Sequence, residues 1–83
     1  MYDIAFTDQA KKQLGDLPRE LQERILSVLE RVRIRPDHYI KKLVGDKGYK
    51  IRVGDYRIIV DVDKQKITIL IIKIGHRKNI YDI

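Results

Sequence analysis

The sequence predicts an α+β fold, in which an N-terminal strand and a helical hairpin pack on a small antiparallel β-sheet in the order βααβββ. Three observations indicate this fold. A short alternating apolar stretch opens the chain, two helical patterns follow it, and three apolar-rich strand patterns fill the second half. A chain of 83 residues has room for one hydrophobic core, so residues 1–83 are expected to form a single domain.

The first half of the chain contains one strand pattern and two helix patterns. Apolar side chains alternate over residues 2–6, YDIAF, which is typical of a short strand. Thr7 is a good N-cap for a short helix that Gly15 ends. Pro18 suits the first turn of a second helix, which Pro36 stops. The apolar stripe of this second helix consists of Leu21, Ile25, Val28, Leu29 and Val32. The two helices are therefore expected to form a hairpin with one apolar face that packs away from solvent.

The second half reads as a loop or short edge strand between residues 36 and 48, followed by three strands. The strands are expected at 49–53, 56–62 and 66–74. Gly54 leads the two-residue connection between the first two strands, as a type II′ hairpin turn requires. Segments this close together must pair antiparallel, and the last one is apolar on both faces, which predicts a central position in the sheet.

The strand sequence YKIRV alternates apolar residues with cations. A two-residue turn places Arg52 directly opposite Arg57, with Lys50 one pair further along on the same side of the sheet. The apolar stripe of the helices should cover the other side, which carries Ile51. An uncovered sheet face with three cations is suited to binding phosphate. The alternative is that these are ordinary solvent-facing cations whose charges are screened by salt.

The charge of the chain is unevenly distributed. Residues 1–40 have no net charge, whereas residues 41–83 carry the whole excess of +6. Such asymmetry favours a polyanionic or acidic partner, although lysines that merely keep the surface soluble would give the same count. The chain has no cysteine, which excludes disulfides and thiolate metal sites and fits a reducing cytoplasm. No apolar run is long enough to span a bilayer, so a cytoplasmic location without membrane contact is expected.

Several site chemistries fit the sequence poorly, and no cofactor is expected. His38 and His76 lie in different segments without a carboxylate at ligand spacing, so no zinc site is expected. Asp63 is interpreted as a turn former, and Asp61 as a counter-charge near the cations. The chain has neither a glycine-rich phosphate loop before a helix nor a nucleophilic serine motif.

RNA cleavage fits the available side chains better, because RNA carries its own nucleophile in the 2′-hydroxyl group. The enzyme then supplies in-line geometry, a base, an acid and positive charge for the phosphorane, and the last contribution is often the largest. Arg77 and Tyr81 follow the last strand in GHRKNIYDI. Strict alternation would not aim Arg77 at the cationic face, so Gly75 is expected to end the strand and to allow a bend there.

Four fragments in order resemble the RelE branch of the RelE/ParE superfamily of prokaryotic toxins, and together they cover essentially the whole chain. They are F-x-x-x-A-x-K-x-L at 6–14, K-L-x-G at 42–45, Y-K-I-R-V-x-x-Y-R at 49–57 and I-G-H-R-K-x-I-Y at 74–81. The resemblance implies a RelE-like fold. It also implies a ribosome-dependent mRNA endonuclease that cuts the codon in the ribosomal A site through 2′-hydroxyl attack, giving a 2′,3′-cyclic phosphate.

The resemblance also implies roles for individual residues. The catalytic set consists of Lys50, Arg52, Arg57, Arg77 and Tyr81. Arg57 matches a phosphate-binding arginine, Arg77 an acid or phosphate stabiliser, and Tyr81 a tyrosine that stacks on the substrate base and acts in proton transfer. The expected contacts to RNA or the ribosome are Lys41, Lys42, Lys47, His76 and Lys78.

A cognate RelB-type antitoxin, usually acidic and partly disordered, is the protein partner that the resemblance implies, in a heteromeric toxin–antitoxin complex. The chain ends two residues past Tyr81, without the C-terminal helix that many relatives carry, so the antitoxin is expected to occupy the open sheet face directly. Two alternatives remain open. One is a ParE-like toxin that inhibits DNA gyrase, and the other is a non-catalytic nucleic-acid-binding module.

Overall fold

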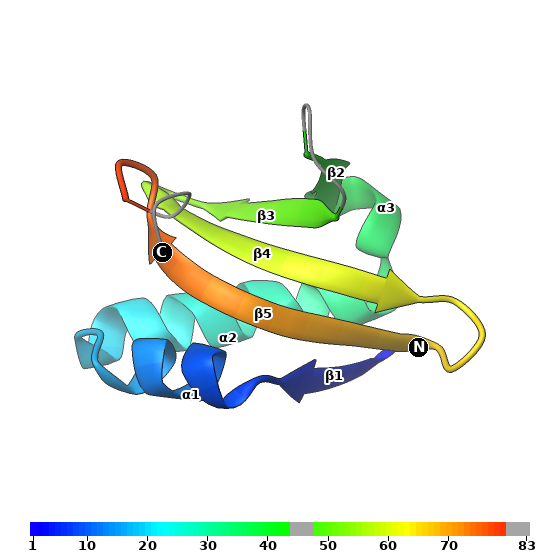
Figure 1. Cartoon of the computed structure of the whole chain (residues 1–83), viewed down its shortest axis with the longest axis horizontal. Helices are drawn as coiled ribbons and strands as arrows, with labels where there is room; N and C mark the ends of the chain where they lie inside the picture. The colour runs from blue at the N-terminus through cyan, green and yellow to red at the C-terminus, as the bar shows by residue number, and fades with distance from the viewer. Residues whose placement is uncertain (44–47, 80–83) are drawn as a thin grey trace.

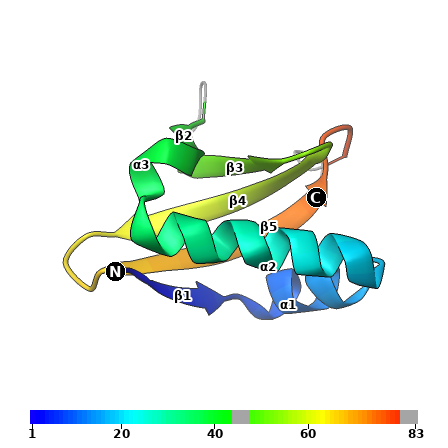
Figure 2. The same ribbon diagram turned by 180° about the vertical axis from the view of Figure 1, so that it is seen from behind.

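The described residues form one five-stranded sheet with helices on one of its faces (Figures 1 and 2). The structure is a computed structural model and describes residues 1–43 and 48–79. Its elements are β1 (Asp3–Phe6), α1 (Asp8–Gly15), α2 (Arg19–Ile34), α3 (Pro36–Tyr39), β2 (Ile40–Lys42), β3 (Tyr49–Val53), β4 (Tyr56–Asp63) and β5 (Thr68–His76). The long helix α2 crosses one face of the sheet, seen in front in Figure 2, and no helix of the described residues crosses the opposite face. The predicted α+β fold is confirmed.

The sheet has the strand order β1-β5-β4-β3-β2 and is mixed rather than wholly antiparallel. β1 pairs in parallel with β5, from Asp3 opposite Thr68 to Phe6 opposite Ile71. The helices that follow β1 provide the long crossover that a parallel pair needs. The region between residues 36 and 48 supplies α3 and the edge strand β2. β4 is the central strand, whereas β5, expected in the centre, lies one place away with a neighbour on each side.

Local chemistry explains where the helices begin. The Thr7 hydroxyl accepts a hydrogen bond from the Ala10 N–H (3.1 Å), so the predicted N-cap of α1 is confirmed. α2 begins directly after Pro18, which lies at its N-cap position. Ile25, Leu29 and Val32 of α2 are buried, because the apolar stripe of the helix faces the sheet.

The β3–β4 hairpin has the register that its two-residue turn predicts. Arg52 lies opposite Arg57, and Ile51 lies opposite Ile58. Gly54 takes a φ of 59°, the positive value that the first central residue of a type II′ turn requires. The main core lies between the helices and the covered sheet face and consists of Ala10, Ile25, Leu29, Val32, Ile51, Val53, Ile58, Val60, Ile69, Ile71 and Ile74. One hairpin therefore sends Ile51 and Ile58 into the core and its cations to the other face.

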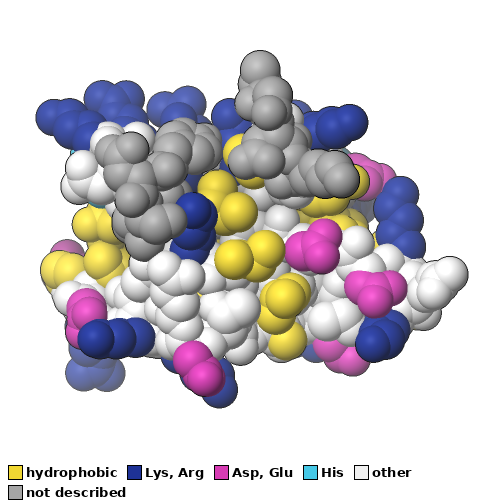
Figure 3. All heavy atoms as spheres, viewed as in Figure 1, with side chains coloured by type: hydrophobic (Ala, Val, Ile, Leu, Met, Phe, Trp, Pro, Cys, Tyr) yellow, Lys and Arg dark blue, Asp and Glu magenta, His cyan; other side chains and the backbone are white. Residues whose placement is uncertain are grey.

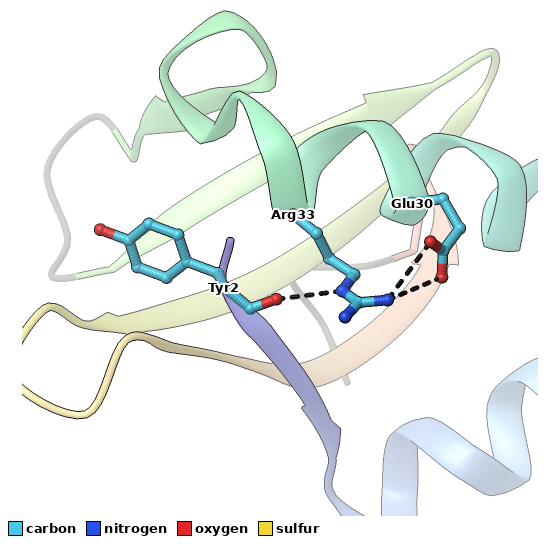
Figure 4. A network of polar contacts seen from close by, with 3 residues as sticks. All are labelled: Tyr2, Glu30 and Arg33. Atoms are coloured by element: carbon cyan, nitrogen blue, oxygen red, sulfur yellow. Dashed lines mark hydrogen bonds and ion pairs between the residues drawn. The ribbon is translucent and has the colours of Figure 1, made fainter.

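Hydrogen bonds join Tyr2, near the start of the chain, to Arg33 in the last turn of α2 (Figure 4). The Arg33 Nε–H donates to the Tyr2 carbonyl oxygen (3.0 Å), and the Tyr2 N–H donates to the Arg33 carbonyl oxygen (3.0 Å). Nη1 of Arg33 also contacts both carboxylate oxygens of Glu30 at 3.3 Å. These contacts hold β1 beside both α2 and β5. No helix within residues 1–43 and 48–79 combines the length and the apolar character needed to span a membrane.

Candidate functional site

Four cations line one hollow on the sheet face that the helices leave uncovered. The hollow has a volume of about 380 Å³ and is lined by His38, Tyr39, Lys41, Lys50, Arg52 and Arg57. We call these six residues the cationic hollow. None of them is acidic, so an anion that enters meets positive charge from the three adjacent strands β2, β3 and β4. The predicted grouping of Lys50, Arg52 and Arg57 on one side of the sheet is therefore observed, and Lys41 joins them.

The guanidinium group of Arg57, in the cationic hollow, has unsatisfied hydrogen-bonding capacity. Its Nη1 atom is buried and has no hydrogen-bond partner among the described residues. Arg52 lies directly opposite on β3, and its own Nε–H donates to the Gly54 carbonyl oxygen at 3.4 Å. Asp61, expected as a counter-charge, makes no ion pair within the described part of the chain, and its carboxylate accepts a hydrogen bond from the Val62 N–H (2.9 Å). A buried guanidinium donor without a partner is costly, and a bound phosphate oxygen would satisfy it.

A β-bulge in β5 changes which face the following residues lie on. Ile59 of β4 pairs with Lys73, whereas the next residue, Val60, pairs with Ile71. β5 therefore contains one extra residue, Ile72, at this point. Such a bulge inverts the alternation of side chains beyond it.

The prediction that Gly75 ends the strand and allows a bend towards the cationic face is wrong. The bulge, rather than Gly75, changes the face on which the following residues lie. β5 runs on past Gly75, and the strand ends only one residue later. Beyond the bulge Ile74 is the buried residue, and Gly75 pairs with Arg57 on the uncovered face. Arg77 follows two residues later in the same phase, and its N–H donates to the Asp55 carbonyl oxygen (2.8 Å). The bulge thus brings Arg77 to the end of the sheet that carries the β3–β4 turn.

Two polar side chains around α1 hold the bulge in place. The Thr7 hydroxyl donates to the Ile72 carbonyl oxygen (2.7 Å) while it caps α1. The Gln13 Oε1 atom accepts a hydrogen bond from the Ile74 N–H (2.7 Å). β1 has already ended at this height of the sheet, so these two side chains take the place of a neighbouring strand. Sequence reasoning missed both contacts, because they join residues 61 and 65 positions apart.

The remaining predicted residues are less closely grouped. His76 lies opposite Tyr56, with the two rings in edge-to-face contact at 5.5 Å, and its Nδ1 atom accepts a hydrogen bond from the Lys78 N–H (3.3 Å). Arg77 and Lys78 are exposed in the turn after β5, and Arg77 does not line the cationic hollow. Lys42 lines a separate hollow of about 290 Å³ with Tyr2, Tyr49 and Lys64 among its lining residues. Lys47 and Tyr81 lie outside the described residues.

Arg24 is a cation near the site that sequence reasoning missed. A Cβ atom added to Gly54 would lie 3.3 Å from Nη1 of Arg24, so this guanidinium rests against the β3–β4 turn. His38 and Tyr39 were not assigned to the site either, yet both line the cationic hollow. Their signal in the sequence is weak, because it depends on how α3 turns back towards β3. Within the described residues, no group of three His, Cys, Asp or Glu side chains is placed to hold a metal ion.

An apolar patch lies on the same uncovered face as the cations. It consists of Leu43, Ile59 and Ile72, which pack together apart from the main core. Ile59 pairs with Lys50, so the patch and the cationic hollow share one face of the sheet. Figure 3 shows this face, with hydrophobic side chains near its middle and Lys and Arg side chains gathered along its upper edge. The face thus combines apolar and cationic surface.

Comparison with known proteins identifies the family. The family model described as ParE toxin of the type II toxin–antitoxin system parDE matches residues 4–81. Toxin RelE3 of Methanocaldococcus jannaschii is 33% identical over 87 residues, which cover 95% of this chain and 94% of the relative. The chain belongs to the RelE/ParE superfamily of toxins.

Solved structures of RelE/ParE proteins share the fold. A chain of the RelBE2 toxin–antitoxin complex of Mycobacterium tuberculosis matches with a TM-score of 0.83 and 25% identity, covering 92% of this chain and 98% of that one. A chain of the intact Escherichia coli RelBE complex matches with a TM-score of 0.78 and 26% identity, covering 92% and 96%. The predicted resemblance is thereby confirmed, and this RelE/ParE protein is a toxin of the type II toxin–antitoxin class.

Proposed function

We propose that this toxin is a ribosome-dependent mRNA endonuclease that cleaves the codon in the ribosomal A site. The observation that carries the proposal is the cationic hollow. It contains four cations and no carboxylate, and one of its guanidinium groups has a buried nitrogen without a partner among the described residues. A phosphodiester is the ligand that this arrangement fits best, because it supplies negative charge and several acceptor oxygens at once.

The reaction we propose is an intramolecular transesterification. The 2′-oxygen attacks the adjacent phosphorus and forms the O2′–P bond, while the P–O5′ bond breaks. A base takes the 2′-hydroxyl proton, an acid gives a proton to the leaving 5′-oxygen, and the products are a 2′,3′-cyclic phosphate and a 5′-hydroxyl. No protein nucleophile is needed, and lysine and arginine supply the positive charge that the phosphorane requires without a metal ion.

Each residue has a place in this scheme. Arg57 would hold a nonbridging phosphate oxygen, and Lys50 and Arg52 would stabilise the charge that develops on the phosphorane. Arg77 would act from the turn after β5 as acid or phosphate stabiliser, and Tyr81 would stack on the base and take part in proton transfer. The contacts to RNA or the ribosome would come from Lys41, Lys42, Lys47, His76 and Lys78.

We also propose a RelB-type antitoxin as the protein partner, in a heteromeric complex in the cytoplasm. The similar structures from Mycobacterium tuberculosis and Escherichia coli are toxin–antitoxin complexes, which supports this assignment. An acidic, partly disordered antitoxin would dock on the uncovered face, where the apolar patch of Leu43, Ile59 and Ile72 adjoins the cations. The net charge of +6 would speed the association.

Primer extension on ribosome-bound message tests the proposal. The wild-type toxin should give cuts within A-site codons, and Arg77→Ala should slow them about 10- to 100-fold with little change in ribosome affinity, because Arg77 acts on the transition state. The same cleavage rate in wild type and Arg77→Ala would contradict the role of Arg77. Inhibition of DNA supercoiling without RNA cuts would instead support gyrase inhibition, the second candidate, which the ParE description of the matching family model favours.

The contact between Gln13 and the bulge gives a second test. Gln13→Leu removes the acceptor for the Ile74 N–H, and the misplaced end of β5 should lower kcat about tenfold while the affinity for ribosomes stays the same. Gln13→Glu keeps an acceptor oxygen at this position and should restore kcat, which a merely structural loss would not predict. A folded Gln13→Leu variant with wild-type kcat would show that the bulge does not position the site.

A further inference from the structure

The side chain of His76 lies on the opposite face of the sheet from the cations. His76 pairs with Tyr56 across β5 and β4, and Tyr56 packs against the main core. Side chains of directly opposed residues share one face of a sheet, so the imidazole ring lies on the face that the helices cover. Gly75, one residue earlier, instead pairs with Arg57, which lines the cationic hollow. The ring is therefore not placed to touch a phosphate bound in that hollow.

His76 bonds the turn that follows β5. The Nδ1 atom of its ring accepts a hydrogen bond from the Lys78 N–H (3.3 Å), and its carbonyl oxygen accepts one from the Asn79 N–H (2.9 Å). Arg77 lies between these contacts, and its own N–H donates to the Asp55 carbonyl oxygen (2.8 Å). Figure 1 shows this turn beside the end of the β3–β4 hairpin. Each backbone N–H of the turn is thus bonded, and His76 accepts two of them.

The imidazole ring is itself held by Tyr56. The two rings meet edge to face, with their centroids 5.5 Å apart and an interplanar angle of 79°. Both residues are half-buried, and such a contact favours one orientation of the ring. In this orientation Nδ1 accepts the Lys78 N–H, so the neutral ring carries its proton on Nε2. The main core thereby supports the turn through two aromatic side chains.

We propose that His76 is a positioning residue for cleavage, because its Nδ1 atom fixes the turn from which Arg77 reaches the scissile phosphate. This inference rests on the proposed function and gives His76 a role that needs no contact with RNA. Few hydrogen bonds hold this exposed turn, so the loss of one would spread Arg77 over several conformations. Misplacement of a catalytic group by about 1 Å can slow a reaction about 10²-fold.

His76→Asn and His76→Leu form a matched pair of variants. The asparagine Oδ1 atom is as many bonds from Cα as the histidine Nδ1 atom, and asparagine readily accepts the N–H two residues later. Leucine has the same branched shape without an acceptor. Both variants lose the aromatic contact with Tyr56, so that loss cancels in the comparison. His76→Gln places its acceptor one bond further from Cα and should behave like His76→Leu.

Single-turnover cleavage on mRNA-programmed ribosomes should be about tenfold slower for His76→Leu than for His76→Asn, with equal affinity for ribosomes. Urea unfolding should show His76→Leu to be at least as stable, because leucine fits a half-buried strand position better than asparagine. A merely structural role would therefore make the leucine variant the more active one. The Lys78 amide should exchange with solvent about tenfold faster in His76→Leu than in His76→Asn.

A double-mutant cycle tests whether His76 acts through Arg77. In the Arg77→Ala background, His76→Leu should lower the remaining cleavage rate by less than about twofold, because no guanidinium is left to position. A further loss of about tenfold in that background would overturn the inference.

The other outcomes separate this inference from the proposed function. Equal cleavage rates for His76→Asn and His76→Leu would overturn the positioning role. Weaker ribosome binding by both variants, with unchanged kcat, would show that the ring contacts RNA itself and would also overturn it. A wild-type toxin that binds ribosomes without cutting RNA overturns the proposed nuclease function instead. The exchange rate of the Lys78 amide then still decides whether His76 holds the turn.

Discussion

Replacement of Arg57 by methionine is expected to slow RNA cleavage about 10²- to 10³-fold, the usual cost of removing one group that stabilises transition-state charge. The fold should meanwhile become more stable, by about 1 kcal/mol, because a buried donor without a partner is destabilising. Like charge from Arg52, directly opposite on β3, adds to this destabilisation. Methionine retains much of the length and apolar character of the arginine stem. Single-turnover cleavage on ribosomes and urea unfolding measure the two effects.

The opposite signs of these two effects make the prediction specific. Lys66→Met removes one exposed cation in the turn between β4 and β5 and should change neither the cleavage rate nor the free energy of unfolding by a measurable amount. Loss of both stability and activity in Arg57→Met would indicate that Arg57 serves the fold. Unchanged cleavage would remove it from the catalytic set.

Ile58→Ala is expected to destabilise the protein by about 3 kcal/mol through the lost burial and the cavity that remains. Ile58 is fully buried in β4 and has Ile51 and Ile74 as its cross-strand neighbours. A domain of 83 residues has a total stability of about 4 to 12 kcal/mol, so the variant should lose about a quarter to three quarters of that stability. The midpoint of urea unfolding measures the change.

Ile67→Ala is the matched control for Ile58→Ala. It removes the same atoms from a residue that is 49% exposed and has a φ of 51°, a backbone conformation that β-branched side chains avoid. This variant should be at least as stable as the wild type. Equal losses at Ile58 and Ile67 would mean that burial in β4 does not determine the stability of the sheet.

Local rules predicted the features of the fold that depend on neighbouring residues. The register of Arg52 against Arg57 follows from a two-residue turn and the strict alternation of strands. The N-cap at Thr7 follows from the chemistry of a single side chain. The parallel pairing of β1 with β5 could not be predicted in this way, because it joins the two ends of the chain.

The same division holds for the candidate site. Lys50, Arg52 and Arg57 lie in one hairpin, so their grouping could be predicted from the sequence. The position of Arg77 could not be predicted from the sequence, because it depends on a bulge in β5. The position of this bulge is set by contacts with Thr7 and Gln13. The burial of the Arg57 guanidinium likewise depends on how the elements around it pack.

The parallel pairing of β1 with β5 has a consequence for folding during synthesis. A nascent chain emerges from the ribosome N-terminus first, so β1 has no parallel neighbour until β5 has been synthesised. The bulge, and with it the approach of Arg77 to the rest of the sheet, likewise forms only after β5 has been synthesised. The sheet is therefore completed only after β5 has been synthesised, so a partly synthesised chain lacks the assembled sheet face on which the proposed cleavage depends.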